Sequence, residues 1–165
     1  MSIGRVCTVG LALVVLAVAA VSGRAQSPAS PGHVLLNSSE LTWGAGPAAL
    51  PPGAKLAVLS GDPGGTGPFT IRAQMPAGYK IPAHWHPTDE HVTVLEGTVA
   101  MGMGDKFDPA QLKDLPAGGF ARMPAEMRHF FTARTAATIQ VHGTGPFAIT
   151  YVNPADDPRA AATAK

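Results

Sequence analysis

The most informative segment of the chain is Gly78-Tyr79-Lys80-Ile81-Pro82-Ala83-His84-Trp85-His86-Pro87-Thr88-Asp89-Glu90-His91-Val92-Thr93-Val94-Leu95-Glu96-Gly97. On a β-strand successive side chains point to opposite faces, so His84 and His86 point the same way. A turn at Pro87-Thr88-Asp89 would then bring Glu90 in from the start of the next strand. Two imidazoles and one carboxylate directed at a common point form a metal site with open coordination positions. The stretch therefore predicts a metal site, although isolated histidines are more often surface or satisfied core residues.

The spacing of these residues also resembles a family motif. Gly78, five residues, His84-x-His86, three residues, Glu90, six residues and Gly97 match the first cupin motif without departure. The carboxylate at this spacing and the flanking glycines favour a metal-ligand role for the two histidines over a role as ordinary surface or core residues.

A second segment resembles the second cupin motif. Gly118, five residues, and then Pro124 to His129 keep the leading glycine, the proline and the histidine of that motif. The segment departs from the family at Glu126, where glycine is usual, and at Ala133, where asparagine is frequent. These departures concern the local turn more than the ligand, because His129 keeps its distance from Pro124.

The resemblance implies a small all-β fold, the double-stranded β-helix or cupin/jelly-roll barrel, with a metal ion inside. The implied ligands are His84, His86, Glu90 and His129, and Glu90 is the candidate catalytic residue, because it could also accept a proton. The cofactor would be one divalent transition metal (Fe, Mn, Ni, Cu or Zn), since imidazoles with one carboxylate suit all of these. Burying such side chains without a metal would cost desolvation energy. The alternative is a metal-free cupin whose histidines only form hydrogen bonds.

Composition and turn signals agree with an all-β domain. Glycine (19) and proline (16) are abundant among the 165 residues, which disfavours a helical bundle because both destabilise helices. Short strand-like runs punctuated by Pro, Gly, Asp or Asn favour a sandwich or barrel. One helical candidate covers residues 108–115, with Asp108 as its cap and Pro109 at its first position. The predicted strands are residues 41–43, 55–59, 69–75, 81–86, 91–95, 99–103, 120–123, 129–133, 138–142 and 147–152.

The first 25 residues have the pattern of a secretory signal peptide. Arg5 precedes an almost wholly apolar run over residues 6–21, and small residues suit cleavage after Ala25 or, alternatively, after Ala20. An uncleaved membrane anchor is the competing interpretation, although the run is short for a bilayer span. The single cysteine, Cys7, lies inside this segment, so the mature chain would have neither a disulfide nor a thiol ligand. We expect a secreted or periplasmic protein with no stable membrane anchor after cleavage.

The domain organisation follows from these assignments. We expect one barrel domain between a short linker and a disordered tail. The boundaries are signal peptide 1–25, linker 26–32, cupin barrel 33–156 and disordered tail 157–165.

The charge of the chain and the exposed edges of its predicted sheets indicate which kinds of partner to expect. Twelve basic against eleven acidic residues give a net charge of +1, with no basic block, so we expect no nucleic-acid partner. A small-molecule substrate or ligand is the expected partner. A small barrel also has exposed sheet edges to bury, and cupins commonly pair through them, so we expect a homodimer.

Polar residues outside the two motifs are weaker candidates. His91 follows Glu90 directly and should face away from the metal. Gln140 and His142 alternate with Ile139 and Val141, so one pair lines the interior and the other faces outward, with the polar pair favoured outside.

Other side chains have a default structural interpretation. Arg72, Arg122 and Arg128 could each meet an anionic substrate, but solvated arginines are more common. The glycine-rich segment 62–67 lacks the Lys-Ser/Thr of a phosphate-binding loop and reads as a turn. Four aromatic residues are predicted as core or pocket wall: Phe130, Phe131, Phe147 and Tyr151.

Three functions remain open. The first is a metal-dependent enzyme resembling cupin dioxygenases, in which the metal would activate O₂ or polarise a small organic substrate. The second is a non-catalytic metal- or ligand-binding or sensing module. The order Gly-Pro-Phe followed by His-x-His is similar to cupin domains of zinc-dependent anti-sigma factors, although no helical partner-binding region is visible beside it. The third is a hydrolase or isomerase with the same ligands.

Overall fold

The computed structural model describes Met1 and residues 32–162, and the fold set out here is that of the unit that begins at Val34. The predicted signal peptide and residues 26–31 of the predicted linker lie outside the described residues. Within the described part of the chain the strands are β1 (Gly44–Ala45), β2 (Lys55–Ser60), β3 (Pro68–Met75), β4 (Lys80–Trp85), β5 (Glu90–Glu96), β6 (Thr98–Met103), β7 (Lys113–Pro116), β8 (Phe120–Met123), β9 (His129–Ala133), β10 (Ala137–Thr144) and β11 (Thr150–Tyr151). The helical elements described are η1 (Ser38–Glu40), η2 (Pro109–Gln111), η3 (Pro154–Asp156) and α1 (Pro158–Ala162).

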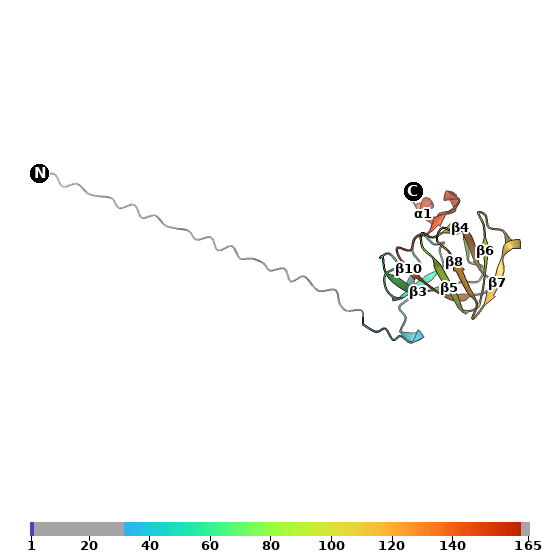
Figure 1. Cartoon of the computed structure of the whole chain (residues 1–165), viewed down its shortest axis with the longest axis horizontal. Helices are drawn as coiled ribbons and strands as arrows, with labels where there is room; N and C mark the ends of the chain where they lie inside the picture. The colour runs from blue at the N-terminus through green and yellow to red at the C-terminus, as the bar shows by residue number, and fades with distance from the viewer. Residues whose placement is uncertain (2–31, 163–165) are drawn as a thin grey trace. The chain divides into compact units, whose positions relative to one another are not determined.

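Two antiparallel sheets form the fold (Figure 1). One has six strands in the order β1-β2-β3-β10-β5-β8, and the other has five in the order β11-β4-β9-β6-β7. Strands distant in sequence lie next to each other, as where β10 pairs with both β3 and β5. The predicted fold class, an all-β double-stranded β-helix, is confirmed.

Alternation of apolar and polar residues explains how the sheets bury one face. In β3 the side chains of Phe69, Ile71 and Ala73 are buried in the core. Arg72, which lies between Ile71 and Ala73, is only partly buried. In β10 Ile139 and Val141 belong to the same core. A period of two therefore separates an apolar face from a polar one. The core lies between the two sheets, and the ligand-bearing strands β4, β5 and β9 border it.

The structure departs from the predicted elements at three places. The first strand is β1 rather than residues 41–43, and only Thr150–Tyr151 of the run 147–152 is a strand. Asp108 does act as a cap by accepting the Ala110 amide hydrogen, but the helix is a single 3₁₀ turn. The chain then enters β7, because pairing with β6 satisfies its backbone, and such tertiary pairing overrides local helix propensity.

The described part of the predicted tail carries a short helix. Residues 158–162 form α1, and the Asp157 carboxylate accepts the backbone amide hydrogen of Arg159 at 2.9 Å. The Arg159 guanidinium donates to the Ile149 carbonyl at 3.2 Å and pairs with Asp157. Residues 163–165 lie outside the described residues. No helix in the described ranges is long and apolar enough to cross a membrane.

Candidate metal centre

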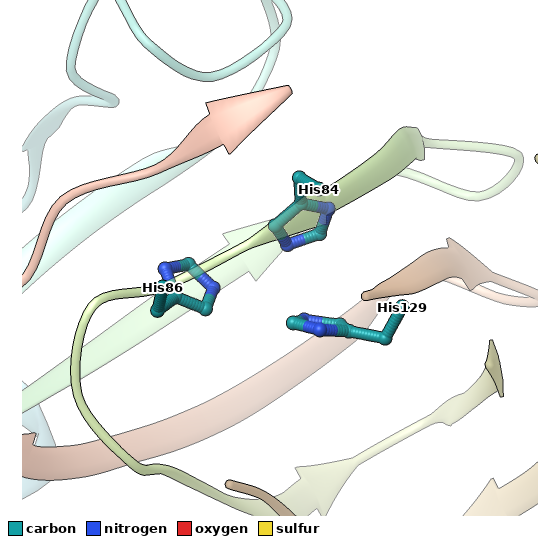
Figure 2. Close-up of side chains that lie close together, drawn as sticks. All are labelled: His84, His86 and His129. Atoms are coloured by element: carbon teal, nitrogen blue, oxygen red, sulfur yellow. The ribbon is translucent and has the colours of Figure 1, made fainter. Parts of the chain in front are cut away.

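Three histidine side chains meet inside the fold. His84 lies near the end of β4, His86 follows that strand, and His129 begins β9. The antiparallel pairing of β4 with β9 sets His84 directly opposite His129. Their ligand atoms lie within 4.8 Å of one another, and the residues are only 3%, 5% and 1% exposed, respectively. Figure 2 shows the three rings turned toward a common point.

Each imidazole is oriented by a backbone carbonyl behind it. The Nδ1 atoms of His84, His86 and His129 bond the carbonyl oxygens of Pro82, Ala148 and Met127 at 2.7, 2.7 and 2.9 Å. A carbonyl can only accept, so each ring carries its hydrogen on Nδ1. In the neutral ring this leaves the Nε2 lone pair free and aimed at the shared point. Metal-binding histidines are held in this way by an outer hydrogen bond on the second nitrogen.

Glu90 brings a carboxylate to the same point. It is 8% exposed, and its Oε2 lies 3.3 Å from His129 Nε2 and 3.6 Å from His86 Nε2. Within the described residues neither Glu90 Oε2 nor His86 Nε2 has a hydrogen-bond partner. Oxygen and nitrogen lone pairs at these distances repel unless a positive charge, a proton or a metal ion, lies between them. The donor set therefore fits a bound cation, and the residues present are those that hold a divalent transition metal in proteins.

The electrostatics of the site favour the metal-binding protonation states. Burial lowers the pKa of His84 to about 3, and the neighbouring His129 and His86 rings add to that effect. Burial likewise lowers the pKa of His86. For Glu90, burial by itself raises the pKa, but a hydrogen bond from His129 and the positive charge of the histidine rings, when these rings are protonated, outweigh it and hold the pKa below its ordinary value. At neutral pH the two imidazoles are therefore neutral and the carboxylate is ionised, which are the forms that bind metals.

Each ligand has an apolar or aromatic neighbour. Residues paired directly across antiparallel strands share a face, so the register identifies the neighbours of each ligand. The Tyr151 hydroxyl donates to the Ala49 carbonyl at 2.7 Å and so turns away from the ligands. The neighbours are Tyr151 beside His84, Met103 beside His129, Met123 beside Glu90, and Phe147 stacked on His86. The core-or-wall interpretation of Phe147 and Tyr151 agrees with these contacts.

The polar residues of β5 and β10 lie on the opposite face. His91 stacks on His142 with ring centroids 4.8 Å apart, and the two residues are register partners. Gln140 accepts a hydrogen bond from Arg72 Nε at 3.2 Å. Val141, which lies between Gln140 and His142 in sequence, is buried in the core. The prediction that His91 faces away from the metal ligands is confirmed, as is the outward placement of Gln140 and His142.

The candidate anion-binding arginines are engaged by other side chains. Arg122 pairs with Asp89 at 2.6 Å, and Arg128 pairs with Asp105 at 2.9 Å. Asp89 is a structural residue that the sequence reasoning missed. Its carboxylate also accepts the backbone amide hydrogen of Ala125 at 2.9 Å, so it ties the first motif to the second. The position of Asp89 directly before Glu90 was the only sign of its importance in the sequence. The local sequence did not reveal that its partners would be Arg122 and Ala125.

The backbone conformation explains why the motif positions are occupied by glycine. Gly78, Gly97 and Gly118 have φ angles of +77°, +74° and +84°, in the left-handed region that glycine adopts without a steric penalty. Glu126, which stands where the family usually has glycine, has a φ of +62°. The backbone turn of the motif therefore persists despite the departure, and the Glu126 amide still donates to the His86 carbonyl at 2.8 Å.

Comparison with known proteins identifies the family of the chain. Residues 31–148 match the family described as the ChrR cupin-like domain. The chain belongs to this cupin family. No curated protein matches this cupin by sequence.

Solved structures show the same fold at low sequence identity. A proposed acetylacetone dioxygenase from Methylibium petroleiphilum PM1 has 22% identity and a TM-score of 0.60, covering 80% of this cupin and 89% of that chain. The polyketide cyclase RemF from Streptomyces resistomycificus has 16% identity and a TM-score of 0.59, with 80% and 94% covered. An RmlC-like cupin from Shewanella frigidimarina NCIMB 400 has 16% identity and a TM-score of 0.54, with 70% and 94% covered. At 16–22% identity this likeness establishes the fold alone.

Proposed function

We propose that this cupin is a metal-dependent oxidoreductase of the dioxygenase type that acts on a small organic molecule. One divalent transition metal would be held by His84, His86, Glu90 and His129. The observation that carries the proposal is the convergence of three Nδ1-anchored imidazoles, within 4.8 Å of one another, on the carboxylate of Glu90. When bound, the metal would supply Lewis acidity and redox chemistry at this point.

The surroundings indicate the class of substrate. With four protein ligands, a six-coordinate ion keeps two positions open, enough for a substrate that binds through two oxygen atoms. The ring of Phe147 on His86 and the buried Met123 beside Glu90 favour an apolar remainder of the molecule. Glu90 would accept a proton from the bound substrate in addition to its ligand role. A dioxygenase places both oxygen atoms in its substrate, so no separate reductant is required. The fold shared with a proposed acetylacetone dioxygenase makes small 1,3-diketones the first substrates to test.

A metal-binding module without catalysis is the second candidate. All four ligand residues are at most 8% exposed, which restricts the approach of a substrate. Four protein ligands also saturate a tetrahedral zinc ion, and closed zinc sites are typically structural rather than catalytic. Such a site would bind its metal tightly and leave no position for turnover.

The location and oligomeric state belong to the proposal as well. The signal-like pattern of residues 1–25 supports export to the periplasm or the medium. N-terminal sequencing of the exported protein checks this, with Gln26 as the expected first residue. A homodimer is supported by the exposed edges of the two sheets. Sedimentation as a monomer at micromolar concentration would remove it.

Metal content is the experiment that separates the two functions. The chain from Gln26, its His86→Ala variant and the matched His142→Ala variant are loaded with metal and analysed. We expect about one ion per chain in the wild type and in His142→Ala, and loss of that ion in His86→Ala. Retained Fe, Mn, Ni or Cu, followed by oxygen consumption with a 1,3-diketone, supports the enzyme. Stoichiometric zinc without an open position supports the closed module, and no metal under any loading condition overturns both.

A further inference from the structure

The three candidate ligands are not held in the same way. The carbonyl groups that accept from His84 and His129 lie only two residues earlier in the chain, so each of these rings is fixed locally. The carbonyl that accepts from His86 belongs to Ala148, 62 residues away. His86 also lies just beyond the end of β4, on the chain that leaves the strand carrying His84 (Figure 2). The orientation of the His86 ring therefore depends on a separate part of the chain.

That part is the segment 145–149, which we call the strap, between β10 and β11. The Phe147 ring lies against the His86 ring with centroids 4.2 Å apart and planes only 17° from parallel. Phe147 also contacts Phe69, with centroids 5.0 Å apart. The next strap residue, Ala148, supplies the carbonyl that bonds His86 Nδ1 at 2.7 Å. Two consecutive strap residues thus set both the plane and the tautomer of one ligand.

The strap is in turn docked on the glycine-rich turn, residues 61–67. The Phe147 amide donates to the Pro63 carbonyl at 2.7 Å, and the Gly145 amide donates to the Gly67 carbonyl at 2.9 Å. The approach at Gly145 is close enough to exclude any side chain. A Cβ atom there would lie 2.3 Å from the Gly65 carbonyl oxygen and 2.8 Å from that of Pro63. Both obstacles are backbone atoms, so they cannot move without displacing the turn or the strap.

We propose that the strap is the positioning element of the metal centre and that it acts on His86 alone. The glycine-rich turn determines where the strap lies, Phe147 orients the ring of His86, and the Ala148 carbonyl keeps the Nε2 lone pair directed at the metal. This inference rests on the proposed metal binding. It also makes metal affinity and strap docking reciprocal, because whatever loosens one must weaken the other by the same free energy.

Paired substitutions test the coupling in the purified protein with Zn²⁺ as the probe. Gly145→Ala displaces the strap at a distance from the metal, and Gly64→Ala is its control in the same turn, where a Cβ would meet only the Asp62 carboxylate at 3.4 Å. Phe147→Leu removes the stacking, and Phe120→Leu is its control at an exposed position. Outer hydrogen-bond partners of metal ligands typically change affinity by about 10- to 100-fold. We expect Gly145→Ala and Phe147→Leu to weaken Zn²⁺ binding by about 10-fold in chelator competition, and both controls to match the wild type.

A second measurement separates positioning from general destabilisation. In the Zn²⁺-loaded protein with ¹⁵N-labelled histidine, the Nδ1–H groups of the ligands report their own exchange with water. His86→Gln assigns the His86 signal. We expect faster exchange at His86 in Gly145→Ala and Phe147→Leu, with the exchange at His84 and His129 unchanged.

The outcomes distinguish the two levels of the proposal. A wild type that binds no Zn²⁺ or other transition metal overturns the proposed function and the strap with it. A wild type that binds Zn²⁺ while both strap variants keep its affinity and its His86 exchange rate overturns the strap alone. Equal acceleration at all three histidines also overturns it, because the effect would then be a general loosening. If Gly145→Ala does not fold, Phe147→Leu carries the same test.

Discussion

The backbone at Glu126 offers a quantitative test of the motif turn. Its φ of +62° lies in the left-handed region, where an L-residue other than glycine pays roughly 1–2 kcal/mol. Replacement by glycine removes that cost. It also makes the unfolded chain more flexible, which lowers the stability of the folded protein by roughly 0.5–1 kcal/mol. The difference predicts that Glu126→Gly stabilises the protein by about 0.5–1 kcal/mol. For a domain of this size the melting temperature should rise by about 2–5 °C.

Chemical denaturation of the metal-free protein measures this difference directly, with Glu126→Ala as the control. Alanine also removes the carboxylate but keeps the Cβ that causes the strain, so it should give no such gain. The Glu126 amide, which donates to the His86 carbonyl, is retained in both variants, so the fold around His86 should be unchanged. A glycine variant no more stable than the alanine variant would refute the strain argument.

Three further perturbations test the core and the links between the motifs. Phe130 is fully buried, so Phe130→Ala should cost about 3–5 kcal/mol of unfolding free energy, measured by denaturant titration. Tyr151→Phe removes the hydroxyl that donates to the Ala49 carbonyl and should cost about 1 kcal/mol, and an unchanged midpoint would contradict that bond. The Ala125 amide and the Arg122 guanidinium lower the pKa of Asp89. Asp89 therefore contributes stability above its unfolded pKa, and that contribution is lost as the pH falls through the lower folded pKa. Asp89→Asn should reduce stability at neutral pH and flatten its acid dependence. Parallel pH profiles of the two proteins would exclude this role.

Much of the fold and of the histidine cluster could be predicted from local pattern. The period of two in β3 and β10 indicates which faces are apolar, because the pleat of a strand is the same in any context. The spacing from His84 through Glu90 to Gly97 places ligand-type side chains where one strand ends and the next strand in the sequence begins. The positive φ angles at Gly78 and Gly97 explain why those positions hold glycine.

Other features depended on contacts between distant segments. Residues 108–115 have the cap of a helix, yet their second half pairs as β7 with β6, because the open edge of a sheet is a stronger partner than a short helix in solvent. Residues 147–149 have strand-like composition, but the backbone of this loop bonds the turn at Pro63 and the ring of His86.

The chain by itself thus determined which residues can bind a metal and which faces are apolar, since both follow from residue type and a period of two. The way His86 is held depends instead on the tertiary fold. Its carbonyl partner at Ala148 and its stacking partner at Phe147 are about sixty residues away in sequence. Local spacing carries no information about such a pairing, because it exists only when the chain beyond β10 has returned to pair with β4 through β11 and the strap is docked on the glycine-rich turn.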